Sequence, residues 1–203
     1  MSLETVNRSL FAVISAPADL SGLTLWLATL AAKGSIFVLA ALVAWTWLLA
    51  RPGERRALER LVLAVPLALA LNYVIGLVYP HPRPFMAGLS RNFLGHSAES
   101  SFPSDHASLM WTVAFGMLIG SQAKWAGGLA VALAALTSWA RVFLGVHFPF
   151  DILGSMAVAA VAVSAVAPLR PLIVRAVSRP IERWYGGVAK QLCCWRDRRR
   201  APK

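Results

Sequence analysis

The sequence predicts an all-helical integral membrane protein: a bundle of five to six transmembrane helices with an interfacial N-terminal helix and a basic amphipathic C-terminal tail. Of its 203 residues, 58% are hydrophobic and 14% are charged, whereas a soluble domain is usually about half apolar and a quarter charged. The charges are also segregated, which leaves apolar runs that can cross a bilayer core of about 30 Å. We divide the chain into a membrane-embedded domain, residues 1–168, and a basic tail, residues 169–203.

The first elements are a short amphipathic helix and a long apolar run. Residues 4–15 predict a helix lying in the membrane interface. The apolar run from about Leu23 to Ala50 contains Lys33 and is too long for a perpendicular span, so we expect it to tilt or to begin at the interface. The side chains of the first helix that we expect to face lipid are Leu10, Phe11, Val13 and Ile14.

Further apolar runs predict the rest of the bundle. The expected spans cover residues 61–79, 106–120, 125–145 and 152–167. Asn72 lies inside the first of these spans, and we expect it to make an interhelical hydrogen bond.

The distribution of positive charge predicts the topology. The net charge is +11, but no aromatic-interleaved basic module accompanies it, so we do not expect a nucleic-acid partner. Four arginines lie in the loop 51–60, Lys124 lies in the turn after the third span, and ten Lys or Arg residues lie between Arg170 and Lys203. The positive-inside rule therefore places the tail in the cytoplasm and the opposite loops outside.

Chemistry-bearing residues gather in those opposite loops. All four histidines fall in two polar breaks between apolar runs: His81, His96 and His106 in the first, and His147 in the second. Histidine exchanges protons near neutral pH, and arginine, also present in both breaks, binds phosphate groups. The pattern predicts a reaction site at one membrane face, although for His81 and His96 themselves we favour the role of polar interfacial anchors.

The second break has a spacing suited to a nucleophilic histidine. Asp151 follows His147 by four residues, so helical backbone would place the carboxylate beside the imidazole. A carboxylate that accepts a proton from one ring nitrogen leaves the other nitrogen free as a nucleophile. Asp151 is also a candidate cap for the last span.

The first break predicts an anion-binding site. Ser104 immediately precedes an apolar helical run, which is an N-cap position, and a helix N-terminus offers free N–H groups to a phosphate. His106, in the first turn, would point to the same place. Arg83 and Arg141 are candidates for paired, charge-assisted hydrogen bonds to phosphoryl oxygens.

Three segments carry a resemblance to a known family: PHPRPF at residues 80–85, SFPSDHAS at 101–108 and ARVFLGVHFPFD at 140–151. Their order and spacing resemble the signature of the type-2 phosphatidic acid phosphatase superfamily, whose members are helical, metal-independent and often membrane-embedded. The wider match, from GLVYPHPRPF to HFPFDILG with the N-terminal NRSLFAVISA, is similar to the bacterial undecaprenyl-diphosphatase branch associated with bacitracin resistance.

The resemblance implies a role for each matching residue. His147 would form a phosphohistidine intermediate, Asp151 would orient and polarise it, and His106 would protonate the leaving oxygen and then activate water. The residues implied to hold phosphoryl oxygens are Arg83, Ser104 and Arg141. The resemblance implies no metal and no cofactor.

Several positions depart from the family pattern or have a secondary role. The family's first motif usually opens with a lysine seven residues before its arginine, and this chain has Gly76 there. Asp105 replaces the glycine of the second motif, and Ala140 replaces the serine of the third. Asp105, Glu99 and Pro84 are possible secondary site residues; the two acidic groups would bind a cation or tune proton transfer, or are simply solvated loop charges.

The function implied by the resemblance is hydrolysis of undecaprenyl diphosphate to undecaprenyl phosphate and inorganic phosphate, which recycles the cell-wall lipid carrier at the outer face of the bacterial cytoplasmic membrane. The same machinery would also serve a phosphatase for phosphatidylglycerophosphate or phosphatidic acid, or a phosphotransferase to lipid A. A small membrane transporter or lipid-binding protein is the alternative outside enzymes. It is disfavoured because the ionisable residues gather at one face, whereas transporters place polar residues near the midplane. The sequence leaves the oligomeric state open.

Overall fold

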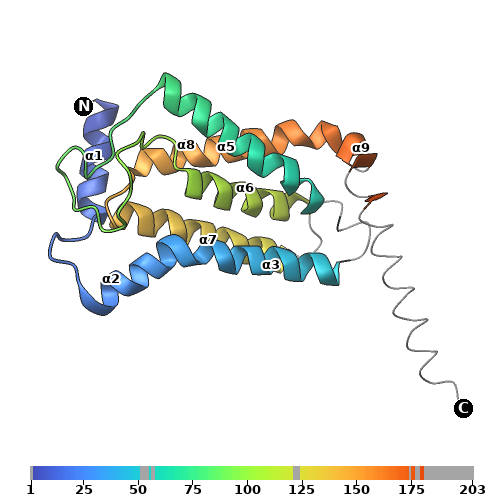
Figure 1. The fold of residues 1–203 in the computed structure, drawn as a ribbon, viewed down its shortest axis with the longest axis horizontal. Helices are drawn as coiled ribbons and strands as arrows, with labels where there is room; N and C mark the ends of the chain where they lie inside the picture. The colour runs from blue at the N-terminus through green and yellow to red at the C-terminus, as the bar shows by residue number, and fades with distance from the viewer. Residues whose placement is uncertain are drawn as a thin grey trace, which may run out of the picture.

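The computed structural model describes residues 2–50, 55, 58–120, 124–173, 175–176 and 179–180. Long helices run side by side along the length of the molecule, and the segment from Tyr79 to Ser104 covers one end of the bundle (Figure 1). The described residues form helices and loops without strands, which confirms the predicted all-α fold.

Helix α6 (Asp105–Gly120) is the centre of the bundle. It packs against α5 (Leu61–Val78), α7 (Lys124–Phe143) and α8 (Pro149–Val166). The most buried apolar side chains of α6 are Ala107, Met110, Ala114 and Met117. Small and flexible residues at these positions let the neighbouring backbones approach closely, as membrane helices require.

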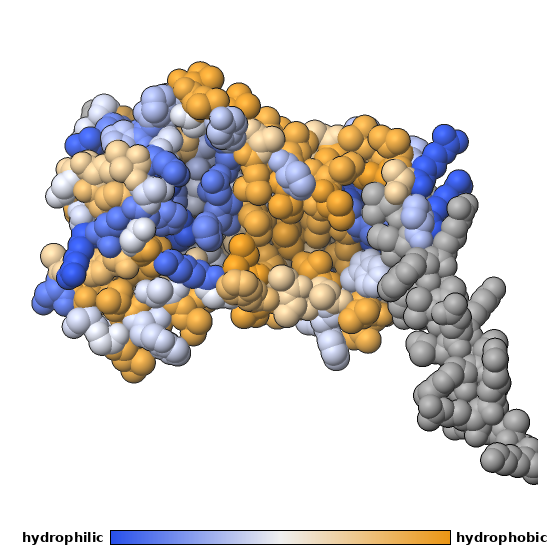
Figure 2. Space-filling model, in the orientation of Figure 1, coloured by the Kyte–Doolittle hydropathy of each residue, from blue (hydrophilic) through white to orange (hydrophobic). Residues whose placement is uncertain are grey.

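The face of the bundle seen in Figure 2 is apolar around its middle. The exposed apolar side chains of the long helices include Phe37, Val62 and Leu77, and such side chains suit lipid as the surrounding solvent. Four helical stretches within the described residues are long and apolar enough to cross a membrane: Gly22–Leu49, Leu61–Val78, Lys124–Phe143 and Pro149–Leu169. Together with α6, a central helix of 16 residues, they make up the membrane-embedded body of the protein.

The first long apolar run is two helices joined by a π-helical turn. Helix α2 (Gly22–Thr29) and helix α3 (Ser35–Leu49) flank η1 (Leu30–Gly34), which contains Lys33. The wider turn changes the register between the two helices. The Lys33 ammonium donates a hydrogen bond to the backbone oxygen of Leu94, 3.1 Å away in the covering loop, so the side chain of Lys33 reaches the polar end of the bundle.

Helix α1 (Leu3–Ile14) crosses the end of the bundle that the loop also covers (Figure 1). Leu10 and Val13 are exposed, as predicted, but Phe11 is 2% exposed. Its ring packs edge-on against Phe148, with 5.2 Å between the centroids. The prediction that Phe11 faces lipid is therefore wrong, because the segment before α8 provides it with an aromatic partner that periodicity alone does not reveal.

The last described elements follow α8 directly: the 3-10 turn η2 (Ala167–Leu169) and helix α9 (Arg170–Ile173). The proposed boundary between residues 168 and 169 falls inside η2 and stays a prediction. The predicted basic tail lies outside the described residues from position 181 onward.

Candidate active site

His147 lies in a short connection whose geometry is fixed by the end of helix α7. Gly145 adopts φ +72°, and a Cβ at this position would collide with Ser90. The Gly145 N–H donates to the oxygen of Val142 and the Val146 N–H donates to that of Arg141, the two bonds of a Schellman motif. The chain reverses here and carries His147 back over the end of α7, which bears Arg141.

The Nε2 atom of His147 faces two guanidinium groups. It lies 3.2 Å from NH1 of Arg83 and 3.2 Å from NH2 of Arg141. Because arginine can only donate hydrogen bonds, Nε2 accepts them through its lone pair. The nitrogen that can attack an electrophile therefore points to the place where two cations would hold an anion.

The Nδ1 atom of His147 is held by the segment before α6. It lies 2.9 Å from the backbone oxygen of Ser101 and 3.5 Å from Oδ2 of Asp151. The sequence predicts that Asp151 itself accepts the Nδ1 proton; the carbonyl of Ser101 is nearer and takes that place. Asp151 Oδ2 instead accepts hydrogen bonds from the Ser101 hydroxyl and, at 2.7 Å, from the backbone N–H of Phe148. Asp151 thus fixes both chain segments that hold the imidazole, and it also caps α8 as predicted.

Burial keeps His147 neutral. Its side chain is 1% exposed, and desolvation lowers its pKa to about 3; the charges of Arg141 and Arg83 act in the same direction and Asp151 opposes them. A neutral ring with the proton on Nδ1 is the nucleophilic form of histidine.

Both arginines are buried and have unused donors. Arg83 is 6% exposed and Arg141 is 1% exposed. Among the described residues, Nε of Arg83 and both Nε and NH1 of Arg141 are buried without a hydrogen-bond partner. A buried cation with unpaired donors is costly unless a ligand supplies the acceptors. The donor set therefore fits an oxyanion with several oxygens, such as a phosphoryl group.

His96 contacts the site directly, which corrects its interpretation as an interfacial anchor. Its Nε2 lies 2.8 Å from NH2 of Arg141. Burial lowers the pKa of His96 to about 4, and Arg141 and Arg83 add to the effect, so the neutral ring accepts the bond from Arg141. The sequence separation of 45 residues between them hides this contact.

His106 and Ser104 occupy the start of α6. The Ser104 hydroxyl accepts a bond from the Ala107 N–H at 3.5 Å, which confirms the predicted N-cap, and Ser104 is fully buried. The His106 ring stands edge-on to His96, with 6.3 Å between the centroids. His106 thus lies next to His96, the ring that contacts Arg141.

His106 also borders a cavity of about 520 Å³ between α3, α5 and α6. Glu99, Asp105 and Gly76 line the same cavity, so the two acidic candidates face this space. Asp105 accepts a hydrogen bond from Nδ2 of Asn72 at 2.8 Å, which joins α6 to α5 as predicted for Asn72. Pro84 is buried beside Arg83 at the start of a turn, in which the Arg83 carbonyl accepts from Met86. There it fixes the backbone that presents the Arg83 guanidinium.

Ser101 and Ser155 are site residues that the motifs do not single out. Ser101 supplies the carbonyl that holds His147, and Ser155 accepts a bond from the Ser104 N–H at 2.9 Å. Serine is common in loops and membrane helices, so the residue type alone does not indicate a place in the site. Its position three residues before Ser104 in the SFPS segment is the only sequence clue for Ser101.

Comparisons with known proteins agree with this site. Residues 57–174 match the family model of the PAP2 superfamily. The chain is 37% identical over 154 residues to the putative undecaprenyl-diphosphatase YbjG of Escherichia coli (strain K12), covering 76% of this chain and 77% of that protein. It is 40% identical over 91 residues to the undecaprenyl-diphosphatase BcrC of Bacillus subtilis (strain 168), covering 45% and 46% of the two chains.

A solved structure shares the fold. The crystal structure of Aquifex aeolicus LpxE superposes with a TM-score of 0.64 at 23% identity, covering 82% of this chain and 98% of that one. The matched family model covers more than half of the chain and includes every residue placed at the site above. These findings confirm the resemblance inferred from the three motifs, and this chain belongs to the PAP2 superfamily.

Proposed function

We propose that this protein hydrolyses undecaprenyl diphosphate to undecaprenyl phosphate and inorganic phosphate through a phosphohistidine on His147. The observation that carries the proposal is the position of His147 Nε2, 3.2 Å from a guanidinium nitrogen of Arg83 and of Arg141. The names of the relatives from E. coli and B. subtilis supply the substrate class.

In the first step, Nε2 of His147 attacks the terminal phosphorus of the diphosphate. A nitrogen–phosphorus bond forms while the bridging phosphorus–oxygen bond breaks, and His106, entering the step as an imidazolium beside the negatively charged diphosphate, donates a proton to the departing oxygen and is left neutral. Arg83 and Arg141 hold the phosphoryl oxygens in the donor geometry that is already in place, so little reorganisation is needed in the transition state.

In the second step, His106 removes a proton from a water molecule, whose oxygen attacks the phosphorus of the intermediate. The nitrogen–phosphorus bond breaks, inorganic phosphate leaves, and His147 returns to its neutral form. The helix α6 N-terminus, capped by Ser104, adds backbone N–H groups at the phosphate end of the site.

The lipid part of the substrate has a complementary surface. The cavity that His106 borders shares Ile36 and Leu109 with an apolar groove of about 560 Å³ between α3, α5 and α6. A polyprenyl chain in this groove stays in the membrane while its diphosphate reaches the histidines, since the cavity joins the groove at Ile36 and Leu109 and is bordered by His106.

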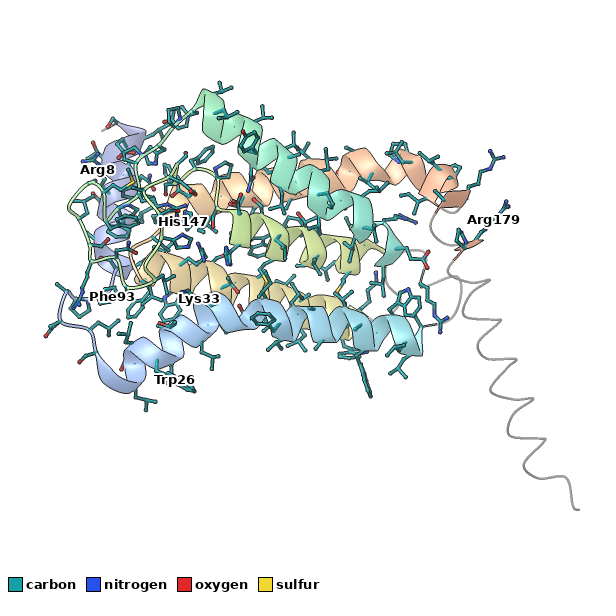
Figure 3. All side chains as sticks on the ribbon, viewed as in Figure 1. Arg8, Trp26, Lys33, Phe93, His147 and Arg179 are labelled. Carbon is teal, nitrogen blue, oxygen red and sulfur yellow. The ribbon has the colours of Figure 1, made fainter. Side chains whose placement is uncertain are left out.

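We place the site on the outer face of the bacterial cytoplasmic membrane. His147 and Arg179 lie at opposite ends of the bundle (Figure 3). Among the described basic residues, Arg55 follows the end of α3, and Arg60 and Lys124 lie at the starts of α5 and α7, the helix ends away from the site (Figure 1). The positive-inside rule then puts the Arg179 end in the cytoplasm. A reporter fused after Lys203 that works only in the cytoplasm should be active; an inactive fusion would reverse the orientation.

A panel of lipid substrates tests the proposed function. Purified protein is assayed for phosphate release from undecaprenyl diphosphate, phosphatidylglycerophosphate and phosphatidic acid, each with and without lipid A as an acceptor. We expect the highest kcat/KM for undecaprenyl diphosphate, with water as the acceptor. A preference for one of the other lipids, or transfer of the phosphate to lipid A, would contradict the proposal.

A further inference from the structure

We propose that His81 is a positioning residue that links the catalytic carboxylate of Asp151 to Glu4 on helix α1, so that α1 holds the nucleophile-bearing segment in place. The inference rests on the proposed function of His147 and Asp151. It gives a role to a histidine and to a helix that the phosphoryl-transfer steps do not use.

One oxygen of Asp151 and one ring nitrogen of His81 are buried close together without hydrogen-bond partners. Asp151 is 1% exposed, and its Oδ2 is well bonded, but its Oδ1 is buried without a hydrogen-bond partner among the described residues. The Nδ1 atom of His81 is also buried and unpartnered, and it lies 3.7 Å from this Oδ1. A buried carboxylate oxygen without a donor costs about 1–3 kcal/mol or more. A small closing movement would pair the two atoms and remove that cost.

The other edge of the His81 ring faces Glu4 on helix α1. Nε2 of His81 lies 3.6 Å from Oε2 of Glu4. Both ring nitrogens therefore lie within 4 Å of a carboxylate oxygen, and an N–H on either nitrogen has an acceptor beside it. The ring is fixed between them, because it stacks on Tyr79 at 6.1 Å and meets the edge of Phe148 at 5.3 Å.

Helix α1 and the residue after it make further contacts with residues 143–150, the segment that contains His147. Asn7, which is 3% exposed, accepts a hydrogen bond from the backbone N–H of Phe150 at 3.0 Å. The Phe11 ring packs on Phe148, and the N–H of Ala16, just after α1, donates to the oxygen of Phe143 at 2.8 Å. Contacts from α1 thus lie along both sides of His147 in the sequence, and His81 adds a link to Asp151.

These contacts have one consequence for catalysis. Asp151 bonds to Ser101 and to the backbone of Phe148, and both of these segments orient the His147 ring. Removing the donor at position 81 would loosen the nucleophile while leaving the phosphate-binding arginines in place. The expected signature is therefore a fall in kcat with little change in KM.

The test compares variants of His81. His81→Phe keeps the aromatic packing but removes both N–H donors, and we expect kcat to fall about tenfold or more while KM stays within about twofold. His81→Asn restores one N–H donor toward Asp151 and should recover most of the lost kcat. Tyr79→Phe keeps the stacked ring and serves as the control with unchanged kinetics.

The link to α1 is tested at Glu4, whose side chain is 41% exposed and also accepts a hydrogen bond from Arg8. Glu4→Gln should lower kcat about two- to fivefold, in line with a partly exposed contact. The same change should have no further effect in the His81→Phe background, because the two residues act through one link. Asp19→Asn, an exposed carboxylate change near the same end of the chain, is the matched control.

A readout without substrate separates this inference from the proposed function. In the wild-type protein, ¹⁵N NMR of His147 should show one tautomer, with the proton on Nδ1; in His81→Phe we expect a mixture of tautomers. If the wild type fails to hydrolyse the lipid diphosphate, the proposed function fails, and the tautomer spectra still test the role of His81. Wild-type kcat and a wild-type His147 spectrum in folded His81→Phe would overturn the inference. If that variant does not fold, unchanged kinetics of Glu4→Gln would overturn it instead.

Discussion

The backbone oxygen of Ser101 lies 2.9 Å from Nδ1 of His147, closer than Oδ2 of Asp151 at 3.5 Å. A carbonyl oxygen can only accept, so the contact fixes the proton on Nδ1 and leaves Nε2 free. The carboxylate of Asp151 acts one step further out, by holding the Ser101 hydroxyl and the backbone of Phe148. The expected effects of several mutations follow from this division of roles.

Ser101→Ala and Asp151→Asn should differ in severity. The alanine variant keeps the carbonyl that accepts from Nδ1, so we expect about a tenfold loss of kcat. The asparagine variant places an amide where Oδ2 accepts two hydrogen bonds and removes the charge that balances Arg83, so we expect a loss of about a hundredfold or more. Steady-state kinetics with the preferred lipid measure both; equal losses would contradict the order of contacts.

His96 should affect substrate binding more than turnover. Its neutral ring accepts a hydrogen bond from Arg141 and orients that guanidinium. Removing the bond in His96→Ala costs about 0.5–1.5 kcal/mol, so KM should rise by up to about tenfold, whereas His96→Asn retains an acceptor and should be milder. An unchanged KM in His96→Ala would show that Arg141 needs no support from this side.

His147 should remain neutral in mildly acidic solution. Its pKa is lowered to about 3 by burial, so the ¹⁵N signals of its ring should not titrate between pH 7 and pH 5. This difference makes the stability depend on pH, because an unfolded histidine, with a pKa of about 6.5, binds a proton that the folded ring does not bind. The contribution of the neutral ring to the free energy of unfolding is fully present above pH 6.5 and is lost as the pH falls toward 3.

Thermal unfolding in detergent checks that sign. The unfolding temperature of the wild type should fall between pH 7 and pH 5, and His147→Gln should reduce the fall because the titrating ring is gone. A His147 ring that titrates near pH 6.5 would show that the site is more open to water than its burial indicates.

Gly76→Lys should be accepted by the fold. A Cβ at Gly76 would lie 3.7 Å from the nearest atom, the Cβ of Ser100, which is an ordinary contact distance. The new ammonium would enter the cavity that Glu99 and Asp105 line, where opposite charges favour it. We expect a folded, active variant with unfolding behaviour close to the wild type. Misfolding would show that the cavity is closed at this position, and Gly128→Lys, where no atom lies within 4 Å, is the matched control.

The sequence was most informative where function restricts residue type at short spacing. Arg141, His147 and Asp151 lie within eleven residues of one another, and the Schellman turn and the start of α8 bring them together through local structure alone. The cap at Ser104 and the hydrogen bonds of Asn72 follow from equally local rules of helix ends and membrane helix packing.

Contacts that depend on how the covering loop crosses the bundle could not be predicted in this way. His96 meets Arg141, His81 meets Asp151, and Ser101 meets His147 across 45 to 70 residues, and no periodicity connects such positions. The burial of Phe11 belongs to the same class, because it depends on where Phe148 emerges after α7.

The most direct test of the account is phosphate release from undecaprenyl diphosphate by the wild type and by His147→Ala, measured side by side in excess chelator. Lys124→Gln, a change at the opposite end of the bundle, is the control. We predict turnover by the wild type and the control that survives the chelator, and no turnover by His147→Ala. A His147→Ala protein that still releases phosphate at the wild-type rate would contradict the role of His147 as the nucleophile.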